Sequence, residues 1–214
     1  MLIDRIDEIY RQQIGPDTAT YHGSQNRREF GECIDHLDRC IGRLAGSEIW
    51  FLEIGAYKGL WALALSELCR HNGKTPRYVT VTWLEHDPNN KDLLVTQQYY
   101  ASNHLDFHLI DADSTKAATL KRVLAIHPRF DIVFIDGDHA FKSVLADIGH
   151  YGPLATERII FHDINTRSCG VRKAVEKAGL FLHLQIAYGD VMGIGIHDVT
   201  AGTRVAPKRR FAFF

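Results

Sequence analysis

The chain has 214 residues, 45% of them hydrophobic and 24% charged, a composition typical of globular proteins that excludes a disordered or collagen-like chain. The 25 Lys and Arg residues against 26 Asp and Glu residues leave a net charge of -1, which argues against broad binding to nucleic acid phosphates. We therefore expect one compact domain whose partner is a small molecule and not a nucleic acid.

The first 48 residues show helical periodicity without strand signals. Apolar residues recur at helical spacing in two stretches, which Gly- and Pro-containing breaks separate. Asp4 and Asp7 lie where a signal peptide needs an apolar stretch, and no run approaches the roughly 20 apolar residues that cross a bilayer. The pattern predicts an N-terminal helical extension over residues 1–48, in a cytoplasmic protein without membrane contact.

Five strand-like segments follow, and each is succeeded by a helix-like stretch. The strand-like segments are apolar runs rich in β-branched and aromatic residues, at 49–54, 78–84, 107–110, 131–135 and 158–161. The helix-like stretches lie at 59–71, 88–102, 114–126, 139–150 and 170–178. Regular alternation of strand and helix predicts a parallel sheet with helices on both faces, because parallel neighbours need a long crossover.

The last part of the chain changes character. The runs at 181–187 and 191–198 are separated by a short turn and predict a hairpin, which would add an antiparallel pair at one sheet edge. Residues 49–214 are thus expected to form one α/β domain, with a Rossmann-like, doubly wound and mostly parallel sheet in three layers.

The turn after the first predicted strand carries two glycines. The sequence Glu53-Ile-Gly-Ala-Tyr-Lys-Gly59 leaves a buried strand and opens a helix, where a glycine-rich turn lets backbone approach a nucleotide-like ligand. Tyr57 stands where the dinucleotide pattern GxGxxG has its second glycine, so a ligand smaller than a dinucleotide is favoured. A tight strand-to-helix turn without a ligand is the alternative for this segment alone.

The ends of the second and third predicted strands offer polar groups for a nucleoside. Glu85 lies 26 residues after Gly59, and an acid at that place can accept both hydroxyls of a ribose. Asp113 or Ser114 could face an adenine edge, although capping of the next helix is an equal alternative for both. Trp83, beside this region, is expected to belong to the core.

Acids and histidines follow the fourth and fifth predicted strands. The sequence Phe-Ile-Asp-Gly-Asp-His at 134–139 carries Asp136 and His139, and the next strand leads into His162 and Asp163. The carboxyl ends of parallel strands meet at one sheet edge, so these four side chains should converge. Two carboxylates and an imidazole suit a divalent metal that acidifies a substrate hydroxyl, whose proton His139 could take. The alternative is that the four groups satisfy one another.

Together these segments resemble a class I S-adenosylmethionine-dependent methyltransferase. Within that superfamily they resemble the small branch of metal-dependent O-methyltransferases that includes macrocin-type and mycinamicin-type enzymes and cephalosporin-hydroxylase-like proteins. The resemblance covers roughly residues 28–198 and is carried by E-I-G-x-x-x-G at 53–59, by 134–139 and by Ile-Phe-His-Asp at 160–163. It implies a seven-stranded sheet whose last strand is antiparallel.

The resemblance also implies roles for individual residues. It places a divalent metal, Mg²⁺ or Mn²⁺, on Asp136, His162 and Asp163, with His139 as the base and Asp136 also catalytic. His162 stands where the family has a carboxylate, so a softer ion or chemistry without a metal stays open. The S-adenosylmethionine site implied by the resemblance comprises Glu53, Gly55, Ala56, Tyr57, Gly59, Glu85, His86, Asp113, Ser114 and Asp136.

The sequence therefore predicts an enzyme that methylates a hydroxyl group of a small molecule, such as a sugar or a secondary metabolite, and that can form a homo-oligomer. Acceptor contacts are expected from residues 1–48 and from the loops 164–170 and 188–193. One alternative is a nicotinamide-dependent oxidoreductase or epimerase, which would normally need the glycine that Tyr57 replaces. Another is a non-catalytic nucleoside-binding protein, which would not need the cluster around Asp136.

Overall fold

A computed structural model describes residues 1–15, 26–85, 92–166, 170–188 and 192–200, together with the backbone of 208–211. Its strands are β1 (Glu48–Ile54), β2 (Thr75–Thr82), β3 (Asp106–Asp111), β4 (Phe130–Ile135), β5 (Ala155–Phe161), β6 (Leu184–Ala187), β7 (Ile194–Asp198) and β8 (Lys208–Phe211). Its helices are α1 (Leu2–Gln13), α2 (Arg27–Arg43), α3 (Leu60–His71), α4 (Leu93–Ser102), α5 (Ala117–Ile126), α6 (Phe141–Tyr151) and α7 (Val171–Lys177).

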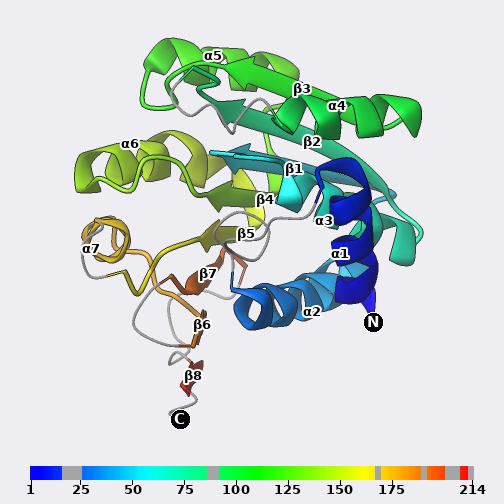
Figure 1. Ribbon diagram of the computed structural model, residues 1–214. Helices are drawn as coiled ribbons and strands as arrows, with labels where there is room; N and C mark the ends of the chain where they lie inside the picture. The colour runs from blue at the N-terminus through cyan, green and yellow to red at the C-terminus, as the bar shows by residue number, and fades with distance from the viewer. Residues whose placement is uncertain (16–25, 86–91, 167–169, 189–191, 201–207, 212–214) are drawn as a thin grey trace.

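The strands form one sheet with helices on both faces (Figure 1). The strand order is β3-β2-β1-β4-β5-β7-β6-β8, in which β1 to β5 pair in parallel and β7 runs antiparallel to both of its neighbours. The predicted seven-stranded, mostly parallel fold with its antiparallel hairpin is confirmed. The short strand β8, which pairs in parallel with β6, extends the sheet by one strand that the sequence pattern did not predict.

Two apolar cores lie on opposite faces of the sheet. Side chains of the central strands alternate between them, so that Phe51 enters one core and Leu52 the other. Helices α1, α2 and α3 pack on the first face, whereas α5, α6 and α7 pack on the second. Burial on both faces explains why these strands are continuous apolar runs in the sequence. Within the described residues, no helix combines the length and the hydrophobicity that crossing a bilayer requires.

The two N-terminal helices are part of the first core. Phe30 of α2 meets Trp61 of α3 edge to face, with ring centroids 4.9 Å apart. The Arg27 guanidinium joins α2 to α1 through a 3.1 Å ion pair with Asp7. Asn26 caps α2 by accepting hydrogen bonds from two backbone N–H groups of its first turn. The described part of the predicted helical extension therefore shares one core with the sheet.

The turn after β1 brings the ends of β1 and β4 unusually close. Gly55 has a φ of +86°, and its N–H donates to the Val81 carbonyl over 2.9 Å. A Cβ atom at this position would lie 2.2 Å from the Asp136 carbonyl oxygen and 2.7 Å from the Cα of Gly137. Glycine is required here both for the left-handed backbone and for the close approach.

We expect Gly55→Ala to lower the free energy of unfolding by about 2 kcal/mol or more, because the substitution combines backbone strain with a clash against backbone. Urea unfolding measures the effect. Gly149→Ala in α6 is the matched control, since a Cβ there meets nothing within 4 Å. Helix propensity predicts that this control changes stability by no more than about 1 kcal/mol, in the stabilising direction. Equal losses of stability in the two variants would contradict the prediction.

Candidate functional site

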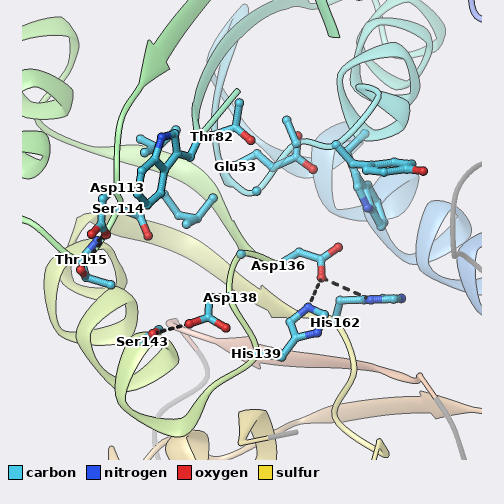
Figure 2. A pocket seen from close by; sticks show the side chains of 18 of the residues that line it. Glu53, Thr82, Asp113, Ser114, Thr115, Asp136, Asp138, His139, Ser143 and His162 are labelled. Atoms are coloured by element: carbon cyan, nitrogen blue, oxygen red, sulfur yellow. Dashed lines mark hydrogen bonds and ion pairs between the residues drawn. The ribbon is translucent and has the colours of Figure 1, made fainter. Parts of the chain in front are cut away.

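A cavity of about 710 Å³ lies at the carboxyl ends of strands β1 to β5. In Figure 2, Asp113, Ser114 and Thr115 stand at one side of it, and Asp136 and His162 stand at the other. Glu53 and the end of β2 lie between these groups in the same view. The volume is in the range of small-molecule and cofactor sites, and the position is the ligand crevice expected of an open parallel sheet.

Glu53 is a buried acid in the wall of this cavity. It is 1% exposed, and its Oε2 has no hydrogen bond within the part of the chain that the structure describes. Burial raises the pKa of Glu53 well above its usual value, and the charge of Asp136 adds to this effect. A buried acceptor of this kind suits an ammonium or N–H group of a ligand, which would restore the missing hydrogen bond.

The glycine-containing turn at 55–59 follows Glu53 closely in the chain. Gly55, Ala56 and Tyr57 line the cavity, and Tyr57 has a left-handed φ of +46°. Gly59 does not line the cavity but begins α3, where a Cβ would lie 2.6 Å from the Thr96 hydroxyl oxygen. The second glycine of the motif therefore allows α3 and α4 to pack closely.

In the loop after β3, the carboxylate of Asp113 forms its hydrogen bonds within the loop itself. The Asp113 carboxylate accepts hydrogen bonds from the N–H and the hydroxyl of Thr115, over 2.9 and 2.7 Å, and pairs with Lys116 at 3.2 Å. The hydrogen bond from the Thr115 hydroxyl is the main reason that the pKa of Asp113 is lowered. Asp113 thus closes the turn before α5, whereas the N-cap of α5 is Lys116, so the expected capping of this helix by Asp113 or Ser114 was wrong. Asp113, Ser114 and Thr115 all line the cavity.

The end of β2 differs from the expectation. The strand ends at Thr82, and the exposed Glu85 is not among the residues that line the cavity. Thr82 and Trp83 line it instead, and Trp83 is 49% exposed, so its assignment to the core was wrong. The contact of Glu85 with a ribose stays a prediction, and His86 lies outside the described residues.

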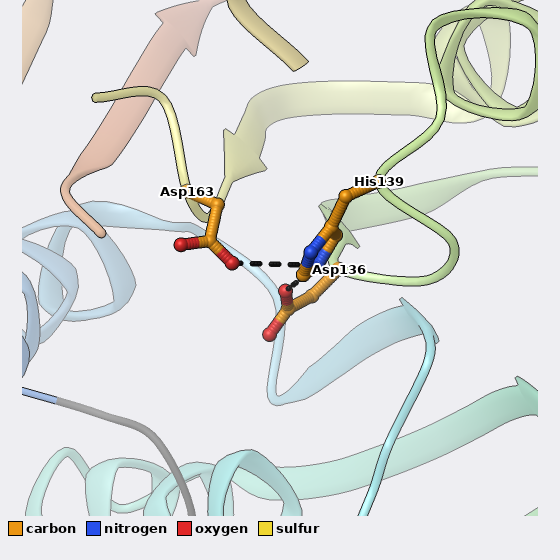
Figure 3. A group of neighbouring side chains, drawn as sticks. All are labelled: Asp136, His139 and Asp163. Atoms are coloured by element: carbon orange, nitrogen blue, oxygen red, sulfur yellow. Dashed lines mark hydrogen bonds and ion pairs between the residues drawn. The ribbon is translucent and has the colours of Figure 1, made fainter. Parts of the chain in front are cut away.

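Four side chains converge at the ends of β4 and β5, as the strand pattern predicted. His139 Nε2 lies 3.3 Å from Asp136 Oδ1 and 3.4 Å from Asp163 Oδ2. His162 Nδ1 lies 3.3 and 3.2 Å from the same two carboxylate oxygens. Figure 3 shows the His139 ring beside both carboxylates, with a dashed line to each. We call these four residues the acid–histidine cluster.

The charges of the acid–histidine cluster are strongly coupled. Burial alone would lower the pKa of His162, but the charge of Asp136 and hydrogen bonds to both carboxylates outweigh it and raise the pKa to about 10. Burial alone would raise the pKa of Asp163, but the hydrogen bond and charge of His162 hold it at about 2. The hydrogen bond to Asp136 raises the pKa of His139. Both imidazoles therefore favour the ionised form of the two carboxylates and lower the pKa of each.

The cluster also has the spacing of a metal site. One ligand atom each from Asp136, His139 and Asp163 lies within 4.8 Å of the other two. The predicted ligand set of Asp136, His162 and Asp163 shares both carboxylates with this group, and its imidazole stays a prediction. The two imidazoles differ in depth, since the side chain of His162 is 4% exposed and that of His139 is 41% exposed.

Asp147 lies beneath the turn that follows β4. It is fully buried on α6, and a Cβ on Gly137 would lie 3.6 Å from its Oδ2. Burial raises the pKa of Asp147 to about 7, the charges of Asp113 and Asp138 add to this effect, and the Ser114 hydroxyl only partly opposes it. Asp147 is therefore a largely neutral buried acid below pH 7.

The sequence matches the family described as "Methyltransferase domain" over residues 52–164. No curated protein matches the chain in sequence. The fold is similar to that of the SAH-bound Podospora anserina methyltransferase PaMTH1, with a TM-score of 0.58, 16% identity, and coverage of 92% of this chain and 87% of the other.

Two further solved structures share the fold. The O-methyltransferase NovP has a TM-score of 0.57 and 12% identity, over 89% of this chain and 87% of its own. The rRNA methyltransferase aviRa from Streptomyces viridochromogenes has a TM-score of 0.52 and 13% identity, over 89% of this chain and 92% of its own. At these identities the similarity shows a common fold, and it leaves the methyl acceptor to be argued from the site.

We expect Asp147 to make the protein less stable as the pH rises from about 4 to about 7. In this range the folded state keeps the Asp147 proton, whereas an unfolded carboxyl, with a pKa near 4, has lost it. Because Asn cannot ionise, Asp147→Asn should gain on the order of 2 kcal/mol relative to wild type between pH 5 and pH 8. Urea unfolding at both pH values measures this difference. The same stability difference at pH 5 and pH 8 would contradict a buried neutral acid.

Proposed function

Because the chain belongs to the methyltransferase domain family and has the fold of class I S-adenosylmethionine-dependent methyltransferases, we propose that it methylates a hydroxyl oxygen of a small molecule with help from a divalent metal. The observation that carries the proposal is the acid–histidine cluster at one side of a cavity whose other side offers polar groups for a nucleoside. A non-catalytic nucleoside-binding protein would not need that cluster.

The remaining lining of the cavity supports S-adenosylmethionine as the methyl donor. The orphaned Oε2 of Glu53 would accept a hydrogen bond from the ammonium group of the methionine part. The turn at Gly55 lets this part lie against backbone, while Ser114 and Thr115 would face the adenine. This orientation would direct the sulfonium methyl group toward the side of the cavity that holds the acid–histidine cluster (Figure 2).

The donor set of the cluster fits a divalent cation. Asp136 and Asp163 belong both to the predicted ligand set and to the observed group, so we propose these two carboxylates as ligands. Carboxylate oxygens with an imidazole suit Mn²⁺ and related ions, and Mg²⁺ less well. Such a cation would lower the pKa of a bound acceptor hydroxyl and hold its oxygen in place.

His139 is the residue that we propose as the base. It is the more exposed of the two imidazoles, and the carboxylates on either side of its Nε2 would stabilise the imidazolium that forms. The acceptor oxygen then attacks the methyl carbon in line with the breaking carbon–sulfur bond, and S-adenosylhomocysteine leaves. A nitrogen that coordinates the metal cannot also accept this proton. In this mechanism, therefore, His162 would supply the imidazole that helps Asp136 and Asp163 to hold the metal.

The net charge of -1 supports a small acceptor over a nucleic acid, because phosphate binding draws on an excess of Lys and Arg. A sugar or a secondary metabolite carries the hydroxyl group that this chemistry needs. The cytoplasmic location and the homo-oligomer stay predictions. Size-exclusion chromatography with light scattering tests the second.

We expect isothermal titration calorimetry to show that the purified protein binds S-adenosylhomocysteine and does not bind NAD. Tyr57 stands where a pyrophosphate-binding turn has a glycine, so a dinucleotide should not fit against this backbone. Added Mn²⁺ should bind as a separate event, which Asp136→Asn or Asp163→Asn removes because each takes away a carboxylate ligand. Binding of NAD without binding of S-adenosylhomocysteine would favour an oxidoreductase.

Paired histidine variants separate the base from the metal ligand. We expect His139→Gln to lower methyl transfer to a hydroxylated acceptor by about 10²- to 10⁴-fold and to leave the affinity for Mn²⁺ within about threefold. His162→Gln should weaken Mn²⁺ binding by at least tenfold. His71→Gln, a change at an exposed residue outside the cavity, is the control. The roles are exchanged if His139→Gln is the variant that loses Mn²⁺.

A further inference from the structure

The side chain of Glu29, in the first turn of α2, joins this helix to the hairpin formed by β6 and β7. Its side chain is buried, and its Oε1 accepts the N–H of Tyr188 over 2.7 Å. Its Oε2 accepts the N–H of Gly193 over 3.0 Å. The two partners follow β6 and precede β7, respectively, so one carboxylate holds both ends of the connection between these strands.

The same connection is bonded to the segment that carries Asp163. The N–H of Ile164 donates to the Gly193 carbonyl over 3.2 Å, and the N–H of Asn165 donates to the Met192 carbonyl over 2.8 Å. The N–H of Met192 in turn donates to the Thr166 hydroxyl oxygen over 2.9 Å. Two neighbouring stretches of backbone are thus joined by three hydrogen bonds.

The Thr166 hydroxyl completes the path to the acid–histidine cluster. It donates to Asp163 Oδ1 over 2.7 Å, while Asp163 Oδ2 faces both imidazoles. Asp163 also has a φ of +56°, a left-handed conformation that costs a residue with a side chain roughly 1 kcal/mol or more. Such a conformation persists only where surrounding contacts fix it.

We propose that Glu29 is a positioning residue for Asp163. The path runs from the Glu29 carboxylate to the backbone at 192–193, from there to Thr166, and from Thr166 to Asp163 Oδ1. The inference rests on the proposed function, because it gives Asp163 the task of holding a metal beside the acceptor. In this proposal α2 belongs to the side of the cavity that binds the acceptor, and the strand ends form the side that binds the cofactor.

The test compares Glu29→Gln with Glu32→Gln. An amide can accept only one of the two N–H groups that the Glu29 carboxylate holds, and its NH₂ group faces the other. Glu32 lies one turn further along α2 and accepts the hydroxyl of the same Tyr188, but its bond does not lead toward Thr166. The two variants each remove a charge from the same helix. Because the charge of Glu29 also acts on His162 and Asp163, hydrogen exchange of the backbone, and not affinity alone, reports the path.

We expect Glu29→Gln to weaken Mn²⁺ binding by about tenfold and to leave the affinity for S-adenosylhomocysteine within about twofold, both by calorimetry. The amides of Ile164 and Asn165 should exchange hydrogen for deuterium at least tenfold faster than in wild type. Glu32→Gln should leave all three quantities unchanged. Thr166→Val keeps the side-chain shape and should weaken Mn²⁺ binding as Glu29→Gln does, without a change in α2.

The outcomes separate this inference from the proposed function. Unchanged exchange at Ile164 and Asn165 in Glu29→Gln overturns the positioning role, whatever the protein binds. Equal losses of affinity for Mn²⁺ and S-adenosylhomocysteine also overturn it, since they indicate general loosening. If wild type binds neither compound, the proposed function fails, while the exchange experiment still decides whether Glu29 fixes the segment of Asp163.

Discussion

Repulsion between the carboxylates of Asp136 and Asp163 is the constraint to which the rest of the site responds. The two residues follow strands β4 and β5, which pair in parallel, so the topology forces both to the same sheet edge. Two ionised carboxylates whose oxygens lie within 4.8 Å of each other are stable only with positive charge beside them. The protonated imidazoles of His139 and His162 supply this positive charge, and a bound divalent cation would supply it in their place. Under the proposed function, proton and metal would therefore compete for one site, and binding of the cation would release protons.

The sequence predicted the fold and the convergence of the acid–histidine cluster for the same reason. In a sheet built from strand–helix units every carboxyl end lies at one edge, so knowing where β4 and β5 end is enough to place Asp136 beside Asp163. The choice of the imidazole ligand was harder to predict from the sequence, because it depends on how deeply each imidazole is buried. His162 lies beneath the carboxylates and His139 lies beside them, and the sequence carries no trace of this difference.

The wrong assignment of Trp83 to the core has a local cause. The predicted strand 78–84 ends at Thr82 in the structure, and this shift places Trp83 at the cavity, while Glu85 is not among the lining residues and its contact with a ribose stays a prediction. At Asp113 the sequence left two roles open. The hydrogen bonds to Thr115 place this residue in the turn before α5, and its contact with adenine stays a prediction. The bonds of Glu29 were beyond prediction for another reason. They join residues 159 and 164 positions apart, and such contacts leave no periodic pattern in either segment.

The two sides of the cavity are built in different ways, and this difference bears on how acceptors are selected. The cofactor side is formed by strand ends and tight turns, where the close approach at Gly55 leaves little freedom for change. The proposed acceptor side depends on α2, the connection between β6 and β7, and the segment after β5, which hydrogen bonds join to one another. Substitutions or insertions in these connecting segments can reshape the acceptor side without disturbing the sheet. Under the proposed function, a single donor site would thus serve different acceptors, provided that the Asp163 carboxylate is held toward the cluster.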